Sequence, residues 1–333
     1  MTVRVFLYDA GGHDREVEID KATLASLDEN TLLWIDVDSR DGGDLTRLAT
    51  SMGLPADCLR RAVAGDAASL DNYGDYFRFA VDAAPQPDAN GHGGSREADH
   101  GPDPGIRIDF ITGGQWLVTV HDGPISFLER FRDQDKAETM IGLLSPQALA
   151  ASLLDWHLGA FFEEVSRIET TVDRLDERVL REATGAGVLG RMVAMRRRVS
   201  RLRALLVRQR EVFYGLSRPD FALITDAGAT PFYEALARRF ERALDEVERA
   251  RDLVTGSFEL FTSRSSQQTN DLVKVLTFLT AIIGFCAAVA GLLGMNFDLA
   301  FFRTGLSGFL IVTGSLALIA VMSLVFARRR NWI

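Results

Sequence analysis

Two hydrophobic periodicities divide the chain. Up to about residue 140, short runs of branched and aromatic residues lie between Gly, Asp and Asn, which is typical of β-strands. These runs are VRVFLY (3–8), LLWIDVD (32–38), YFRFAVDA (76–83), IRIDFIT (106–112) and QWLVTVHD (115–122). Segments 42–53 and 55–65 between them are predicted to be short helices. We therefore expect an α+β domain in which a mixed sheet is flanked by helices.

From about Ser145 the apolar residues recur at steps of three and four, which predicts long amphipathic helices. In the first helix the apolar face consists of Leu154, Leu158, Phe161, Val165, Ile168, Val172, Leu175 and Val179. A second helix follows over 187–218, and a third begins at Pro231 and contains no further proline before Met295. An unbroken third helix of that length would measure roughly 95 Å. These helices are expected to form a stalk.

The second helix contains an arginine-rich stretch, residues 195–210. Core spacing is nevertheless kept by Met192, Met195, Val199, Leu202, Leu205 and Leu206. The arginines therefore fall on the other face, where we expect them to meet the acidic stretch 167–182. A nucleic-acid contact is disfavoured, because the formal net charge of the chain is −9.

Two segments have the length and composition of membrane spans. Residues 275–295 carry no charge, and neither do residues 305–327, and each run can cross a hydrocarbon core of about 30 Å. Lys274 precedes the first run and Arg328 to Arg330 follow the second. The positive-inside rule then predicts that both termini are cytoplasmic, in an inner (plasma) membrane. No signal peptide is apparent, and the two cysteines, Cys58 and Cys286, predict no disulfide framework.

These patterns predict a division into six parts. They are a cytoplasmic α/β domain (1–143), a helical stalk (144–271), a first transmembrane helix (272–296), a periplasmic loop (297–304), a second transmembrane helix (305–327) and a basic cytoplasmic tail (328–333). The Pro/Gly-rich segment 84–105, which holds two histidines, is predicted to be a hairpin loop rather than a metal site. Without a phosphate-cradling loop, a nucleophile elbow or a metal-ligand pair, the chain is expected to be neither an enzyme nor a carrier of a resident cofactor.

One face of the first span is lined by small residues. Thr277, Thr280, Gly284, Ala287, Gly291 and Gly294 recur at steps of three and four. Extended backward, the stripe reaches Val273 and Asn270. Such a stripe has two explanations: close packing of helices, which spacing alone favours, or the lining of a pore. The two explanations are compatible if several copies surround an axis.

The triplet Gly294-Met295-Asn296 lies at the outer end of this span. The last carbonyls of a helix lack intrahelical partners and carry the negative end of its dipole. Converging helix ends would attract a cation, with an amide oxygen from Asn296 and a charge from Asp298. A neutral shell of this kind suits Mg²⁺ that keeps its water. The alternative is an ordinary Gly/Asn cap on a tight turn.

Several motifs together carry a family resemblance. TNDLVKVLT (269–277) leads into a span that ends in GMNF (294–297), and the chain closes on ARRRNWI (327–333). With WIDVD (34–38) and DNYGDYFRFAV (71–81), the chain resembles the CorA family of divalent-cation transporters. The resemblance implies a homopentamer in lipid, with a funnel-shaped cytoplasmic domain and a pore lined by the first span. The implied pore positions are Asn270, Val273, Leu276, Thr280, Gly284, Ala287 and Gly291, with Gly294, Met295, Asn296 and Asp298 at the mouth. Val273 and Leu276 would form an apolar neck that can close.

The chain departs from the family's magnesium transporters at three places. Leu293 stands where they carry Tyr, NFDLAFFRTG (296–305) replaces their Met-Pro-Glu, and Gly284 is smaller than usual. GLLGMN is similar to the zinc-transporting ZntB branch. We predict Mg²⁺ as the transported ion, with Zn²⁺, Co²⁺ or Ni²⁺ as alternatives. A membrane-tethered scaffold or sensor is the alternative of a different class.

Overall fold

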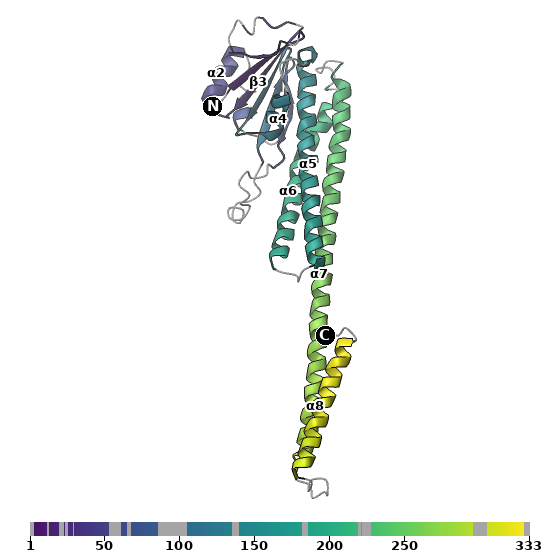
Figure 1. The fold of residues 1–333 in the computed structure, drawn as a ribbon. Helices are drawn as coiled ribbons and strands as arrows, with labels where there is room; N and C mark the ends of the chain where they lie inside the picture. Colours follow the sequence, from purple (N-terminus) through teal and green to yellow (C-terminus); the bar gives the residue numbers. More distant parts are fainter. Residues whose placement is uncertain are drawn as a thin grey trace. The chain divides into compact units, whose positions relative to one another are not determined.

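The structure is a computed structural model (Figure 1). It describes residues 3–11, 13–19, 23, 26–28, 30–52, 61–64, 68–85, 105–134, 140–181, 186–218, 221, 228–295 and 305–329. The chain divides into two compact units. The first consists of Met1–Leu175 with Gly190–Gly256, and the second of Asp176–Leu189 with Ser257–Ile333.

A seven-stranded mixed sheet forms the N-terminal part of the first unit, with strand order β2-β1-β3-β7-β6-β5-β4. The strands are β1 (Val3–Asp9), β2 (Arg15–Glu16), β3 (Thr31–Asp38), β4 (Leu70–Asn72), β5 (Phe77–Asp82), β6 (Arg107–Thr112) and β7 (Trp116–His121). The central pair β3 and β7 is parallel, and the other neighbours are antiparallel. All five predicted strands are confirmed, as is the α+β fold class.

One face of the sheet is apolar where helix α2 (Gly42–Met52) covers it. Alternate residues of β1, β3 and β7 point into this core, since side chains of a strand alternate between its faces. The buried members are Val5, Leu7, Leu33, Ile35, Val37, Leu45, Leu48, Ala49, Tyr76, Ile111, Val118 and Val120. The predicted helix 42–53 is thus confirmed, and of segment 55–65 the structure describes a helix only over 61–64.

Toward β5 and β6, the same face of the sheet carries buried charged residues instead of apolar ones. Asp109 is fully buried and accepts hydrogen bonds from Arg40, at 2.6 Å, and from the fully buried Arg78. Arg78 also contacts Asp71, at 3.0 Å. An isolated buried charge is very unfavourable, so each member of this set depends on the others.

The opposite face of the sheet carries aromatic residues and a second polar network. Trp34 is fully buried and packs edge-on against Phe131 of α4 (Ser126–Gln134). Its indole nitrogen donates to Thr119, which in turn donates to Asp36 at 2.6 Å. Burial disfavours ionisation of Asp36, but hydrogen bonds from His121 and Thr119 and the charge of Arg132 outweigh it and lower its pKa. This network fastens α4 to the sheet.

Two long helices follow, α5 (Pro146–Arg181) and α6 (Ala186–Leu216), and precede α7 (Thr230–Leu293). All eight predicted apolar positions of α5 are at most 3% exposed. Of the six predicted for α6, five are buried and Met195 is half-buried. The third helix has 64 residues, so the predicted continuity from Pro231 is confirmed.

Hydrogen bonds and ion pairs fix the directions of these helices within the first unit. Tyr233 donates to the carbonyl of Gln147 at 2.9 Å, and Arg239 pairs with Asp155 at 3.1 Å. Residue numbers therefore rise together in α5 and α7, so the two helices run parallel. His157 of α5 and Gln209 of α6 are 2.8 Å apart, whereas Arg198, further back in α6, pairs with Glu164. α6 is therefore antiparallel to α5.

Three arginines of α6 form ion pairs with partners other than those predicted. Arg198 pairs with Glu164 of α5, and Arg203 and Arg210 pair with Glu248 and Glu241 of α7. The prediction that these arginines meet the acidic stretch 167–182 is therefore wrong for these three. In an antiparallel hairpin, that stretch lies opposite the beginning of α6 instead.

The second unit contains the C-terminal part of α7 and helix α8 (Gly305–Arg329). Both helices are long and apolar enough to cross a membrane, and none of the most apolar stretch of either is buried within the chain. A core helix of a soluble protein would bury that stretch. Figure 1 shows α8 returning in the direction opposite to the end of α7. The six-part division predicted from the sequence remains a prediction.

Candidate functional site

The candidate site is the exposed face of the C-terminal part of α7. All seven predicted pore positions are exposed in the single chain. The two bulky ones, Val273 and Leu276, are 54% and 64% exposed. Nothing lies within 4 Å of the place where a Cβ would project from Gly284 or Gly291. This face therefore has open space along its whole length in the single chain.

The opposite face of the same helix segment is partly covered. Half-buried positions recur there at steps of three and four: Val275, Phe278, Ile282, Cys286, Val289 and Leu293. At 100° per residue, this set is centred roughly opposite the predicted pore stripe. In α8 a matching set is the least exposed: Gly308, Val312, Leu316, Ala320, Ser323 and Ala327. The chain thus covers one side of α7 itself and leaves the stripe for another occupant.

Polarity changes along the stripe. Asn270 comes first, followed by the apolar Val273 and Leu276, and then by Thr280 and small residues. The Thr280 hydroxyl donates to the Leu276 carbonyl at 2.8 Å. Since that bond uses the only hydroxyl proton, Thr280 can offer just acceptor lone pairs to anything beside the helix. The lining would therefore be apolar over about one turn and cation-compatible beyond it.

The end of α7 is a tightened helical turn. Gly294 donates to the Ala290 carbonyl at 2.9 Å, which continues the helical pattern, and Met295 donates to the Leu292 carbonyl at 3.4 Å. Gly294 is not among the glycines with a left-handed backbone, unlike Gly305 at φ 57°. A left-handed glycine cap at Gly294 is therefore excluded. Asn296 and Asp298 lie outside the described residues.

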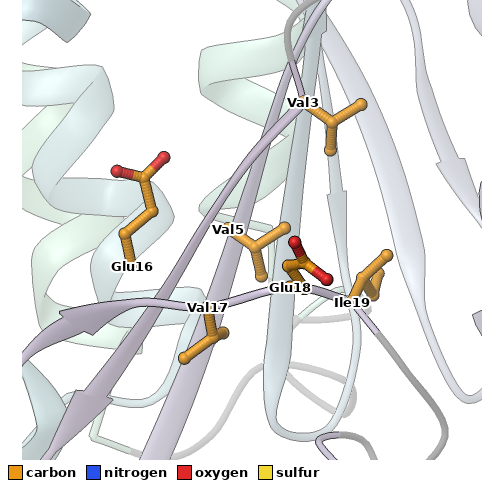
Figure 2. Close-up of a pocket in the computed structure, with 6 residues that line it drawn as sticks. All are labelled: Val3, Val5, Glu16, Val17, Glu18 and Ile19. Carbon is orange, nitrogen blue, oxygen red and sulfur yellow. The ribbon is translucent and has the colours of Figure 1, made fainter.

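Elsewhere, an open hollow of about 520 Å³ lies at the sheet edge formed by β1 and the segment after β2 (Figure 2). It is lined by Val3, Val5, Glu16, Val17, Glu18 and Ile19. The valines and Ile19 give it an apolar wall, and both glutamates are exposed. Two exposed carboxylates alone do not form a metal cage. Among the described residues, no group of three or more His, Cys, Asp or Glu could hold a metal ion.

His157 has a structural role in the first unit. His157 is fully buried, and desolvation lowers its pKa to about 4, against a smaller opposing effect of the hydrogen bond to Gln209. The Gln209 amide nitrogen donates to the carbonyls of Asp82 and Leu205, so its oxygen accepts from His157 Nε2. This neutral imidazole links α5 and α6 to the end of β5.

Comparison with known proteins identifies the family of the whole chain. The family model described as "CorA-like Mg2+ transporter protein" matches residues 29–329, which include strands β3 to β7 and the long helices α5, α6, α7 and α8. The chain belongs to the CorA-like transporter family. The family consists of divalent-cation transporters rather than enzymes, and the predicted resemblance is confirmed.

Individual relatives agree with this membership. The cobalt/magnesium transport protein CorA of Thermotoga maritima is 28% identical over 185 residues, covering 56% of this chain and 52% of that protein. The match thus spans about half the length of this curated relative. The complete structure of the CorA magnesium transporter from Methanocaldococcus jannaschii superposes with a TM-score of 0.73 at 18% identity, and covers 100% of both chains.

The ZntB branch is represented by its cytoplasmic domain. The ZntB cytoplasmic domain from Vibrio parahaemolyticus superposes with a TM-score of 0.59 at 11% identity, covering 80% of this chain and 100% of that one. At these identities the structural likeness establishes the fold alone. The chain is therefore a member of a family of divalent-cation transporters, and it carries two C-terminal helices that are long and apolar enough to cross a membrane.

Proposed function

We propose that this chain forms a homopentameric pore that passes hydrated Mg²⁺ across the inner membrane. Copies would surround an axis with the stripe from Asn270 to Gly291 facing inward, and the outer mouth would be formed by Gly294, Met295, Asn296 and Asp298. The supporting observation is the exposure of all seven stripe residues, opposite the face that the chain covers itself. The number of copies comes from the family resemblance.

The proposed path has a neck and a filter. Val273 and Leu276 would form an apolar constriction that empties of water when narrow. Beyond it, the acceptor oxygen of Thr280 and the helix ends favour a cation, because the last carbonyls carry the negative end of the dipole. Mg²⁺ loses water reluctantly, so amide oxygens of Asn296 that contact its bound waters would suit it. Lys274, Arg328 and Arg329 favour cytoplasmic termini.

Zn²⁺ is the second candidate, since the fold of the ZntB cytoplasmic domain matches. A dehydrated zinc site would need soft ligands such as thiolate or imidazole. Cys286 is half-buried on the covered face of α7, roughly opposite the stripe. It is therefore badly placed to line the pore, and this favours a hydrated ion.

The test is ion flux into vesicles containing the purified full chain. Mg²⁺, Zn²⁺, Co²⁺ and Ni²⁺ would be compared with and without a pH gradient. We expect Mg²⁺ uptake above that of empty vesicles, and Asn296→Ala should reduce it by at least about tenfold while the oligomer still assembles. Asn30→Ala, at an exposed position outside the proposed path, is the matched control. Identical traces with and without protein would instead support a scaffold or sensor.

A further inference from the structure

A buried histidine in the polar network beside α4 has no part in the proposed pore. His121 is the last residue of β7, and its side chain is 4% exposed. The ring lies between two oxygen atoms: Nδ1 is 2.8 Å from the carbonyl oxygen of Gly123, and Nε2 is 3.1 Å from Oδ1 of Asp36. Both distances are those of hydrogen bonds, so the ring protons have to be assigned from what the two oxygens can do.

Both oxygens act as acceptors. A carbonyl oxygen only accepts, so Nδ1 of His121 donates to Gly123. The Asp36 carboxylate accepts from Thr119 and from Arg132, each at 2.6 Å. Burial opposes its charge, but hydrogen bonds from His121 and Thr119 and the charge of Arg132 hold the pKa of Asp36 below its usual value, so it is ionised at neutral pH. An ionised carboxylate only accepts, so Nε2 donates as well.

Each neutral form of this imidazole would place a lone pair against an oxygen. With a proton on Nδ1 alone, the Nε2 lone pair faces the Asp36 carboxylate. With a proton on Nε2 alone, the Nδ1 lone pair faces the Gly123 carbonyl. Because the side chain of His121 is buried, water cannot readily relieve either contact. Only the doubly protonated ring satisfies both oxygens at once.

The charges around the ring favour the same form. From β3 come Asp36 and Asp38, and Asp38 lies 3.8 Å from Nδ1 with its side chain 41% exposed. From α4 comes Arg132, which is bound to Asp36, and the partner of His121 in β6 is the apolar Ile108. Two carboxylates and one guanidinium leave one negative charge, which an imidazolium cancels. The adjacent Asp122 is engaged elsewhere, with Arg40.

The Asp36 carboxylate is bound from both sides of the turn that precedes α4. His121 begins this turn, and Arg132 lies on the helix that follows it. Gly123, inside the turn, has a left-handed φ of 77°, which glycine adopts without strain. The ring of His121 therefore bonds across its own turn and to β3. A charge-assisted hydrogen bond is roughly twice as strong as a neutral one, so loss of the second proton would weaken this link.

We infer that His121 is doubly protonated in the folded chain at neutral pH, and that it forms a pH-sensitive link between β3 and the turn before α4. An ordinary exposed histidine, with a pKa of about 6.5, is about nine-tenths neutral at pH 7.5. The folded chain thus keeps a proton that the unfolded chain releases above about pH 6.5. The stabilisation is complete below that pH and is lost as the pH rises further. The inference concerns the first unit alone and involves no residue of the proposed pore.

The protonation state can be tested by solid-state nitrogen NMR of the full chain in lipid bilayers, with labelled histidine rings. At about pH 7.5 we expect a signal from a doubly protonated imidazole that is lost in His121→Gln and kept in His13→Gln, whose side chain is 85% exposed. Asp36→Asn should also lose the signal, because it removes the opposite charge. Asp38→Asn, the matched control two residues away, should keep it. A wild-type chain without this signal, or a signal that persists in His121→Gln, would overturn the inference.

The link itself is tested by hydrogen exchange of the α4 amides, measured below and above the pH at which the NMR signal converts. After correction for the intrinsic exchange rate, protection in the wild type should fall about tenfold as the ring loses its charge. In His121→Gln, protection should be equal on both sides of that pH. Unchanged protection in the wild type would show that the charge does not hold α4. Failure of ion flux in the same bilayers would count against the proposed pore only.

Discussion

The two compact units treat the same residue types in opposite ways. In the first, the large aromatic residues Trp34, Phe110 and Phe161 are fully buried, and charges such as Arg78 and Asp109 are buried in pairs. In the second, Leu276, Leu306 and Ile311 are 64–76% exposed, and the least bulky side chains form a continuous stripe. The first pattern fits a water-soluble core, and the second fits a segment whose surroundings are lipid and other helices. Exposure therefore has to be judged against the solvent that each unit meets.

The largest mutational effect is expected at the buried ion pairs of the first unit. Asp109→Ala would leave Arg40 and Arg78 without their shared carboxylate, and Arg78 is fully buried. Removing one partner of a buried pair typically costs about 3–5 kcal/mol of unfolding free energy. We expect urea unfolding of the full chain, followed by tryptophan fluorescence, to show this loss. Asp245→Ala, at an exposed position, should change stability by less than about 0.5 kcal/mol.

The next largest effect is expected at buried His157, which makes the unfolding free energy depend on pH. Its folded pKa of about 4 lies below the unfolded value of 6.5, so the unfolded chain binds more protons between these two pH values. The stability it contributes is fully present above pH 6.5 and is lost as the pH falls to about 4, at a cost approaching 3 kcal/mol.

The measurement for His157 is the unfolding free energy across that pH range. In His157→Phe the decline between pH 6.5 and about 4 should flatten, even though Gln209 loses its donor and the variant is less stable throughout. His13→Gln, in which an 85% exposed side chain is replaced, should keep the decline. A parallel pH profile in wild type and His157→Phe would assign the effect to other groups.

The corresponding prediction for the second unit concerns the proposed apolar neck at Val273 and Leu276. Leu276→Gly would remove an apolar ring that excludes water, and we expect the resting leak of Mg²⁺ to rise about tenfold. Leu279→Gly is a close control, because Leu279 is 44% exposed in the same helix but lies outside the stripe. Both changes carry the same helix penalty of about 1 kcal/mol. An equal leak in the two variants would remove Leu276 from the gate.

Much of the fold was predictable from the sequence, because the apolar residues of the long helices recur at regular spacing. The steps of three and four in α5 predicted all eight of its buried positions, and the absence of proline after Pro231 predicted an unbroken α7. Edge strands β2 and β4 have only two and three residues, too few to show a period. Helix α4 is joined to the sheet by a hydrogen bond from Arg132 to Asp36, two residues that are 96 positions apart in sequence. Such distant pairs leave no local signal.

The candidate site was predictable only in part, for a similar reason. Spacing alone identified the small residues from Thr280 to Gly291 and, by extension backward, Val273 and Asn270, whereas Leu276 joined the stripe through the family resemblance. The structure adds that these positions share one exposed face, while Cys286 lies on the face that is partly covered. The roles of these residues in conduction remain predictions. What surrounds the stripe depends on other copies of the chain, and one sequence carries no direct signal for that.

The continuity of α7 has a mechanical consequence. Sharp kinks in helices almost always arise at proline, at Gly/Ser pairs, at π-bulges or where a group inserts into the backbone ladder. From Phe258 to Leu293 this helix contains no proline and no Gly/Ser pair, and it is α-helical throughout. Within the second unit, a torque applied near Phe258 is therefore transmitted along a stiff helix to Val273 and Leu276, and a small rotation of the helix would move both side chains around its circumference together.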